Sequence, residues 1–243
     1  MRKLIALVMT IGTLTLPAVN MAQDLVMPTP DANSATPSSQ PAIIPNAPSI
    51  DATAYVLMDA KSGIVIAEKN ADQSIPPASL TKLMSLYIIF GAIENGTITL
   101  DDKVRISETA WKTGGSKMFV KVGEQVPVSE LVQGIIVDSG NDATIALSEY
   151  VAGSEQSFVE MMNLQAQRLG MNSTHFEDAD GLPSNEHYTT ASDLAILTRA
   201  LINHFPQYYH YFSEKWFTYA GIRQPNRNRL LWRYENADGL KTG

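Results

Sequence analysis

An almost uninterrupted apolar stretch occupies residues 83–93, shortly after a pair of prolines. Two prolines end the element before them, and proline is tolerated in the first turn of a helix. Because nearly every position of the stretch is apolar, we predict a helix that is buried on all sides and ends near residue 95. Ser79 lies at the predicted start of this helix, and Lys82 lies one turn further on the same face.

The segments around this helix show strand and helix patterns. Residues 54–58 and 64–67 are strand-like runs separated by a glycine-containing turn, which predicts a hairpin. Further strands are predicted at residues 216–220 and 230–232. Cap residues and apolar periodicity between them predict four helices: one capped by Ser129, one carrying Ile145 and Tyr150 before Gly153, one from Ser154 to Gly170, and one opened by Thr190 and Asp193 as a capping box. Strands on both sides of a helical region predict one α+β domain whose antiparallel sheet is built from both ends of the chain.

Residues 1–22 have the three-part pattern of a secretory signal peptide: two cations, an apolar run and a small-residue region. We expect cleavage after Ala22, although Asn20 stands where a small residue is usual. Residues 23–48 are rich in Pro, Ala, Ser and Asn without an apolar period, which predicts a flexible linker. One folded domain over residues 49–243 would follow.

Composition limits the kinds of partner. The 243 residues include 18 Lys or Arg and 25 Asp or Glu, which gives a formal net charge of −7. Loss of the signal peptide would remove Arg2 and Lys3 but no acid, and so would leave −9. An acidic surface of this kind argues against nucleic acid as a partner. The sequence contains no cysteine, which excludes disulfides and thiolate metal sites.

The spacing of Ser79 and Lys82 suggests a nucleophile and its base. A lysine can take the hydroxyl proton of a serine only when the amine is neutral, and burial next to another cation lowers a lysine pKa from about 10.4 towards roughly 7 or 8. The alternative is an N-cap serine beside a lysine whose charged end reaches the surface. Ser-x-x-Lys alone does not decide between these interpretations, because both residue types are common.

Two further motifs follow in order. Ser139-Gly140-Asn141 lies in a turn between two predicted helices, and Lys241-Thr242-Gly243 ends the sequence. With Ser-x-x-Lys, this order is typical of penicillin-binding proteins and serine β-lactamases. The sequence resembles the serine-type D-alanyl-D-alanine carboxypeptidases, which are low-molecular-mass penicillin-binding proteins, over roughly residues 50–243. Other segments that look like this family are 115–120, 122–126, 139–143, 170–176 and 221–228.

These residues indicate acyl transfer through a covalent serine ester. Ser79 would attack a peptide carbonyl, Lys82 would accept its proton, and Ser139 would help relay that proton to the leaving amine. Asn141 would hold the amide of the substrate, since its side chain both donates and accepts hydrogen bonds.

The remaining motif residues would bind a carboxylate. Lys241, in the motif that Gly243 completes, would keep Lys82 neutral and attract the carboxylate, and Thr242 would hydrogen-bond it. Arg227 is either a further carboxylate contact or a structural ion-pair partner. The resemblance implies that the carboxylate is the C-terminal one of D-alanyl-D-alanine in peptidoglycan stem peptides, and that β-lactam antibiotics acylate the same serine. It also implies a penicillin-binding or β-lactamase-like transpeptidase fold, exported to the bacterial periplasm or cell envelope.

Three other functions remain open at this point. A β-lactamase needs rapid hydrolysis of its acyl-enzyme, but no Glu here stands in the Glu-x-x-x-Asn pattern of class A enzymes. A non-catalytic peptidoglycan-binding domain would keep unused polar groups in an apolar cleft, which is costly. A D,D-endopeptidase uses the same site and is not separated from a carboxypeptidase by sequence.

The other polar groups receive structural interpretations. The four histidines show no metal-ligand spacing, so we expect neither a metal nor another cofactor and assign them structural or surface roles. They are His175, His187, His204 and His210. Asp178 and Asp180 before Gly181 lack the full ligand series of a calcium loop, and a turn is the better interpretation.

The resemblance also implies more sequence after Lys-Thr-Gly. Members of the family continue through further strands, a closing helix, a small β domain and often an amphipathic membrane helix, so we expect C-terminal strands and a helix of the fold to be missing. Membrane contact is expected only through such an anchor. The family places one oxyanion donor just after this motif, so residues 23–243 are expected to react at least about a hundred-fold more slowly than a longer chain.

Overall fold

The computed structural model describes residue 47 and residues 49–243, which fold into helices and short antiparallel hairpins. The longer helices in this part of the chain are α1 (Lys82–Glu94), α4 (Asn141–Ala152), α5 (Glu155–Leu169) and α6 (Ala191–His204). Shorter helical segments are the 3-10 helix η1 (Ala78–Thr81), α2 (Glu108–Lys112), α3 (Val128–Gln133), the π-helix η2 (Gly134–Asp138), the 3-10 helix η3 (Pro206–Ser213) and α7 (Leu230–Arg233). The strands are β1 (Tyr55–Met58), β2 (Val65–Lys69), β3 (Lys103–Arg105), β4 (Gln125–Pro127), β5 (Trp216–Tyr219) and β6 (Ile222–Pro225). Except for residue 47, the predicted signal peptide and linker lie outside the described residues.

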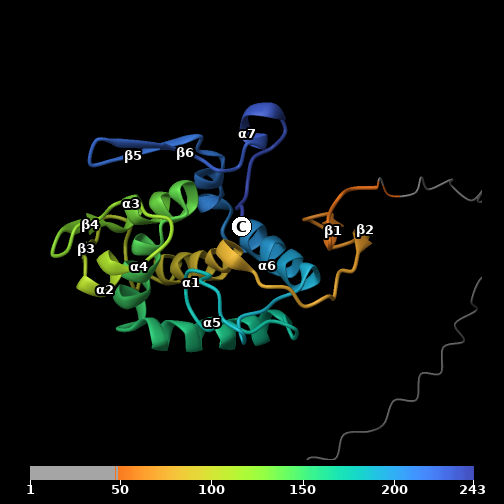
Figure 1. Cartoon of the computed structure of the whole chain (residues 1–243), viewed down its shortest axis with the longest axis horizontal. Coiled ribbons are helices and arrows are strands. Elements are labelled where there is room, and N and C mark those ends of the chain that lie inside the picture. Colours follow the sequence, from red (N-terminus) through yellow and green to blue (C-terminus); the bar gives the residue numbers. More distant parts are fainter. Residues whose placement is uncertain (1–46, 48) are drawn as a thin grey trace, which may run out of the picture. The chain divides into compact units, whose positions relative to one another are not determined.

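Helix α1 is the centre of the fold, and it contacts α4, α5 and α6 (Figure 1). Every residue from Lys82 to Phe90 is buried. The predicted buried helix is therefore confirmed, and its last residue, Glu94, agrees with the predicted end. None of the helices among the described residues is long and apolar enough to cross a membrane.

Ser79 lies in η1, which leads directly into α1, rather than in α1 itself. The N–H of Leu80 donates to the carbonyl of Pro77 at 3.1 Å, so the chain makes a tight turn here. Ala78 has a φ of +48°, which is uncommon for a residue with a side chain. The predicted helix start was therefore wrong by one turn, because cap patterns do not distinguish a 3-10 turn from the first turn of an α-helix.

The strands pair in three separate antiparallel hairpins: β1 with β2, β3 with β4, and β5 with β6. The predicted hairpin near the N-terminal side is confirmed, with Tyr55 opposite Lys69. The prediction of one sheet from both ends of the chain was wrong for the described residues, since no ladder joins β1–β2 to β5–β6. The β5–β6 hairpin packs instead against η2.

Two predictions about local structure were also wrong. Residues 230–232 form part of α7 instead of a strand, because the side-chain oxygen of Asn228 accepts the N–H of Leu230 and the Asn228 carbonyl accepts that of Leu231. A run of three apolar residues contains too little periodicity to exclude this turn. Ser129 does not cap a helix but lies inside α3, which begins at Val128 after a proline.

The caps predicted for the other helices are found. The hydroxyls of Ser154 and Thr190 accept backbone N–H groups at the starts of α5 and α6, and Gly170 ends α5 in the left-handed conformation. The capping box at Thr190 forms only in one direction. The carboxylate of Asp193 accepts from the amide of Ser173 and the hydroxyl of Thr174 instead of returning to the cap.

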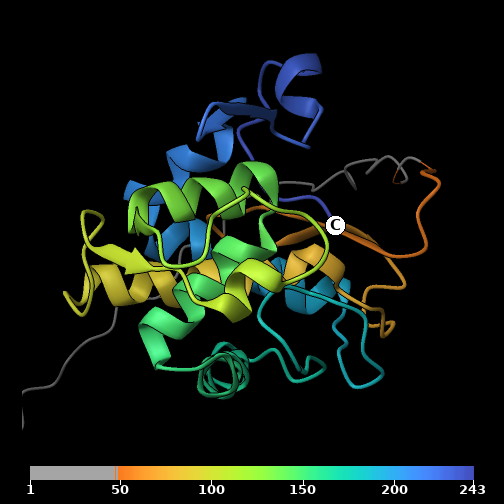
Figure 2. The same cartoon turned by 60° about the vertical axis from the view of Figure 1, so that its left-hand side comes forward.

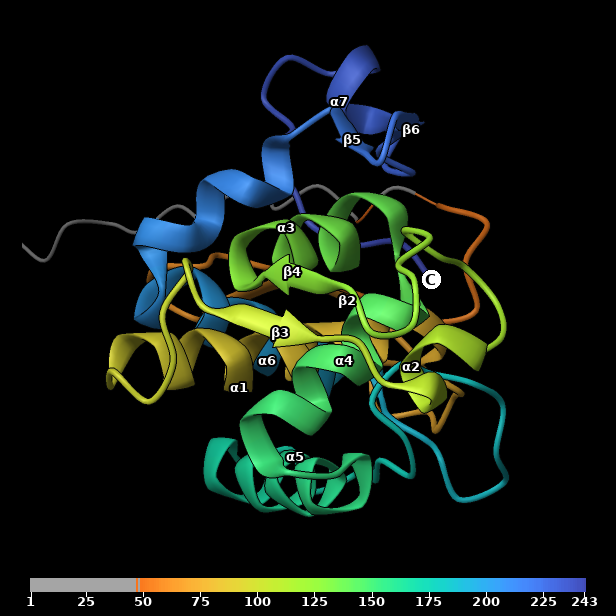
Figure 3. The ribbon, with the colours of Figure 1, turned by 90° about the vertical axis from the view of Figure 1, so that its left-hand side faces the viewer.

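Three segments that are far apart in sequence meet near the start of α1. The 178–181 loop between α5 and α6 and the last residues of the chain lie against it, and Lys241 joins those last residues to the turn at 139–141 between η2 and α4. Figure 2 shows the blue-green connection between α5 and α6 against the gold start of α1. The β3–β4 hairpin lies on the side of α3 and α4 (Figure 3). The fold therefore brings all three predicted motifs to one end of its central helix.

Candidate active site

The first serine–lysine pair is formed by the η1 turn and the first residue of α1. The amine of Lys82 lies 3.4 Å from the hydroxyl oxygen of Ser79. Ser79 is partly exposed, whereas Lys82 is fully buried and also donates a hydrogen bond to the backbone carbonyl of Asp180. The alternative of a surface lysine is therefore wrong, because the amine points inward. Ser79 also caps no helix in the observed structure.

Burial lowers the pKa of Lys82 to about 8. The carboxyl groups of Asp180 and Asp178 act in the opposite direction, and the charge of Arg227 adds to the lowering. A substantial fraction of this amine is therefore neutral near pH 8, as a general base requires. Burial is the main cause of this lowering, and Arg227 adds a cationic contribution that the sequence did not suggest.

The second serine–lysine pair is formed by Ser139 and Lys241. Ser139 is buried in a turn with a φ of +59°, and the amine of Lys241 donates to its hydroxyl oxygen at 2.9 Å. A second bond from this amine reaches the carbonyl of Thr242, also at 2.9 Å. Burial lowers the pKa of Lys241 to about 7, and the charges of Lys82 and Arg227 add to this effect. The two amines therefore disfavour each other's protonation within one site.

Asn141 is the first residue of α4, two positions after Ser139, and hydrogen bonds fix both its side chain and its backbone. Its amide nitrogen donates to the carbonyl of Gly114 at 2.8 Å, and its backbone N–H donates to Ser116 at 2.7 Å. One side-chain N–H and the side-chain oxygen are left without a partner among these bonds, so they can meet a substrate amide. The next residue, Asp142, accepts the backbone N–H groups of residues 118–120, which fixes the loop beside this turn.

Gly243 lies beside the turn that carries Ser79. A Cβ atom built on Gly243 would be 3.6 Å from Leu80 and 4.0 Å from the Cβ of Ala78. Figure 1 marks this end of the chain next to the start of α1. The Lys-Thr-Gly motif and the Ser-x-x-Lys motif are therefore neighbours in space.

Arg227 has an exposed side chain, and among the described residues no carboxylate lies within 4.0 Å of it. Its charge nevertheless influences the pKa values of Lys82 and Lys241. The structural ion pair considered from the sequence is therefore not formed in this part of the chain. An unpaired guanidinium near two amines suits the binding of an anion.

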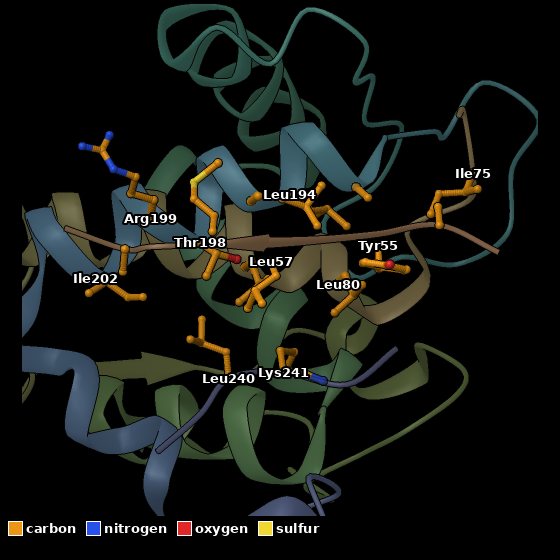
Figure 4. A pocket seen from close by; sticks show the side chains of 17 residues that line it. Tyr55, Leu57, Ile75, Leu80, Leu194, Thr198, Arg199, Ile202, Leu240 and Lys241 are labelled. Carbon is orange, nitrogen blue, oxygen red and sulfur yellow. The ribbon is translucent and has the colours of Figure 1, made fainter. Parts of the chain in front are cut away.

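A cavity of about 480 Å³ lies behind Lys241 (Figure 4). Its walls come from β1, α6 and residues 240–241, and most of the side chains are apolar, with Arg199 at one side. Lys241 alone among the predicted site residues reaches it, whereas Ser79, Lys82 and Ser139 do not line this cavity.

Four polar residues beside Lys82 were not predicted as part of the site. Thr81, His187, Asp178 and Asp180 surround the base or its supporting loop. The sequence assigned His187 a structural role and the two aspartates a turn. The turn is confirmed, since one oxygen of Asp178 accepts the N–H groups of Asp180 and Gly181. The only sequence signal was the position of Thr81 inside the Ser-x-x-Lys motif, because its partner lies 106 residues away.

Two serine–lysine pairs on a helical core supply a nucleophile and nearby amines, the groups that covalent acyl transfer requires. Residues 41–243 match the model of the D-alanyl-D-alanine carboxypeptidase family, and the chain belongs to this family. The α+β fold is that of the penicillin-binding proteins. Penicillin-binding protein 6B from Escherichia coli aligns with a TM-score of 0.80 and 46% identity, over 83% of this chain and 66% of that one.

Two relatives from Escherichia coli are also named D-alanyl-D-alanine carboxypeptidases. The chain is 49% identical to D-alanyl-D-alanine carboxypeptidase DacC of Escherichia coli over 204 residues, which are 81% of this chain and 51% of that protein. It is 47% identical to DacA of the same organism over 208 residues, which are 83% of this chain and 52% of that protein. The chain therefore spans about half the length of these relatives.

Proposed function

We propose that this protein is a serine-type D-alanyl-D-alanine carboxypeptidase that removes the terminal D-alanine from peptidoglycan stem peptides. The observation that carries the proposal is the buried amine of Lys82, which lies 3.4 Å from the hydroxyl of a partly exposed serine and has a pKa lowered to about 8. The relatives described above support the choice of substrate, because they are named as enzymes of this activity.

The reaction begins with attack of Ser79 on the carbonyl between the two D-alanines. As the bond from its oxygen to the carbonyl carbon forms, its proton moves to the neutral amine of Lys82. The carbon–nitrogen bond of the tetrahedral intermediate then breaks. The hydroxyl of Ser139 passes a proton to the departing D-alanine amine and takes the proton of Lys82 in exchange. Water hydrolyses the remaining ester and restores Ser79.

Other residues of the site bind the substrate. The carboxylate of the terminal D-alanine is placed against Lys241, Thr242 and Arg227, with Gly243 beside the backbone that carries Ser79. Asn141 holds the amide of the preceding residue through its free donor and acceptor. We place the enzyme in the bacterial cell envelope, where peptidoglycan is the substrate, and expect β-lactams to acylate Ser79. A penicillin-binding protein D2 from Listeria monocytogenes, 29% identical to this chain, has been solved in an ampicillin-bound form.

A labelled penicillin tests the proposal in protein expressed from its full natural reading frame. The label should attach covalently and map to Ser79, Ser79→Ala should abolish it, and Lys82→Ala should remove most of it. Lys112→Ala is the matched control, because Lys112 pairs only with Glu108 on the surface. D-Alanine release from a peptide ending in D-Ala-D-Ala should follow the same order of variants.

Two outcomes would contradict the proposal. Attachment of the label to another residue would exclude Ser79 as the nucleophile. Rapid release of the label as hydrolysed drug, without D-alanine release from the peptide, would indicate a β-lactamase instead.

A further inference from the structure

A buried chain of polar side chains runs from the nucleophile's turn to the loop that covers Lys82. The hydroxyl of Thr81 lies 2.8 Å from Nε2 of His187, and Nδ1 of His187 lies 3.4 Å from a carboxylate oxygen of Asp178. Thr81 is fully buried and His187 nearly so. Neither side chain can touch a substrate, so this hydroxyl–imidazole–carboxylate chain is not a second catalytic triad.

Both ring nitrogens of His187 are engaged, Nε2 by Thr81 and Nδ1 by the loop that follows α5. Burial favours a raised pKa for Asp178, but hydrogen bonds from His187 and from the Gly181 amide outweigh it, so its pKa lies below the ordinary value. The carboxylate is therefore ionised. The backbone N–H of Glu177 donates to Nδ1 of His187 at 3.5 Å, and the same nitrogen faces the Asp178 carboxylate, so the ring contacts the loop at two residues.

The carboxylate of Asp178 also hydrogen-bonds the loop that covers Lys82. Its other oxygen accepts the N–H groups of Asp180 and Gly181, and the carbonyl of Asp180 accepts a hydrogen bond from Lys82. Gly181 packs so closely that a Cβ there would lie 1.9 Å from the carbonyl oxygen of Ala78. His187 thus connects the residue before the base, Thr81, to the loop that supplies the acceptor of the base.

We propose that His187, with Thr81 and Asp178, is a positioning residue that holds the Asp180 carbonyl over Lys82 and so aims the amine of Lys82 at Ser79. The inference rests on the function proposed above. When Lys82 is neutral, one N–H donates to the Asp180 carbonyl, and the lone pair is left to face Ser79. If the loop moved away, the amine could rotate and water could reach it.

Loss of the chain should therefore change the titration of the base as well as the rate. Lys82 is faced by Asp178 and Asp180 from the loop, Asp142 from α4, Arg227 from the segment after β6, and Lys241 across the site. Burial is the main cause of its lowered pKa, so access of water to the amine should raise that pKa. Acylation of Ser79 would then require a higher pH.

The test compares Thr81→Val, which keeps the shape of the side chain but removes the hydroxyl, with Thr81→Ser, which keeps the hydroxyl. Thr189→Val is the matched control, since it removes a buried hydroxyl that bonds only Thr174. The second-order rate of acylation by a labelled penicillin is measured from pH 6 to pH 10 in protein from the full reading frame. Thr81→Val should lose about ten- to a hundred-fold in rate and shift its pH midpoint upward. Thr81→Ser should retain most of the rate and the wild-type midpoint.

Each outcome decides the inference. If the wild-type protein is not acylated at all, the proposed function and the inference both fail. If the wild type is acylated but Thr81→Val keeps its rate and midpoint, only the inference fails. Equal losses in Thr81→Val and Thr189→Val, without a shift of the midpoint, would show that the chain is merely structural. Should Thr81→Val not fold, His187→Gln decides: a loss of acylation rate with a raised pH midpoint supports the inference, and a wild-type rate and midpoint overturn it.

Discussion

Gly181 is the point of closest approach between the 178–181 loop and the turn that carries Ser79. Its φ is +87°, and a Cβ there would lie 1.9 Å from the carbonyl oxygen of Ala78 and 3.0 Å from the hydroxyl of Thr81. A methyl group and a backbone oxygen cannot occupy that space together, so Gly181→Ala must push the loop or the turn aside. We predict that the substitution separates the Asp180 carbonyl from Lys82.

Two costs add in the Gly181→Ala variant. A left-handed backbone conformation costs about 1–2 kcal/mol for a residue with a Cβ. Overpacking in a close-packed region costs typically about 1–3 kcal/mol more. We therefore expect the free energy of unfolding to fall by about 2–5 kcal/mol, and acylation of Ser79 to slow about a hundred-fold, because a shift of about 1 Å is enough for that loss.

Gly170→Ala separates the two costs. Gly170 has a φ of +82°, and a Cβ there would have nothing within 4 Å. This control should lose only about 1–2 kcal/mol and keep its acylation rate. Urea unfolding gives the stability of both variants, and the rate of labelling by a penicillin gives the acylation. Equal stability losses, together with wild-type acylation of Gly181→Ala, would refute the claim that the loop rests on the nucleophile's turn.

Three further predictions concern the titratable groups and the class of chemistry. Burial lowers the pKa of Lys82 from 10.5 to about 8, so the free energy of unfolding decreases as the pH falls from 10.5 to 8. Below pH 8 the buried lysine is charged and the decrease is complete. Lys82→Met should therefore abolish acylation yet raise the free energy of unfolding at pH 7 by about 1–3 kcal/mol in urea titrations, and this gain should vanish near pH 10.5. Both carboxylate oxygens of Asp138 are buried without a hydrogen-bond partner in the described residues, and burial together with Asp142 raises its pKa to about 7. The free energy of unfolding of the wild type should fall as the pH rises from about 4 to 7. The excess in unfolding free energy of Asp138→Asn over the wild type should therefore grow by about 2–4 kcal/mol between pH 4 and pH 8. A constant difference would contradict the assignment. Because the chemistry assigned to Ser79 and Lys82 needs no metal, EDTA should leave acylation unchanged, whereas loss of activity that zinc restores would exclude the serine mechanism.

Sequence reasoning succeeded where residue type and short spacing are sufficient. The buried α1 follows from its apolar composition, and the motifs around Ser79, Ser139 and Lys241 could be recognised without knowledge of the fold. The identity of α7 could not be predicted, because the side chain of Asn228 decides between a turn and a strand. The separate pairing of β1–β2 and β5–β6 depends on long-range packing that no local pattern contains.

The residues that hold the loop over Lys82 could not be predicted from the sequence for a related reason. His187 gives no signal of its own, since a buried histidine in the core and one that holds a catalytic loop look alike in a sequence. Only the contact with Thr81 distinguishes them, and that contact depends on the tertiary fold. The contribution of Arg227 to the lowered pKa of Lys82 likewise depends on the tertiary fold.

The contacts that assemble the site join residues about a hundred positions apart: 98 from Lys82 to Asp180, 106 from Thr81 to His187, and 102 from Ser139 to Lys241. Pairings across such separations form late, because the closure of long loops must precede them. In a newly made chain Lys82 is hydrated, charged and unable to accept a proton from Ser79. If Ser79 acts as proposed, folding itself activates it, and the serine stays inert towards acylating agents until the segments carrying Asp180 and Lys241 have been synthesised and docked.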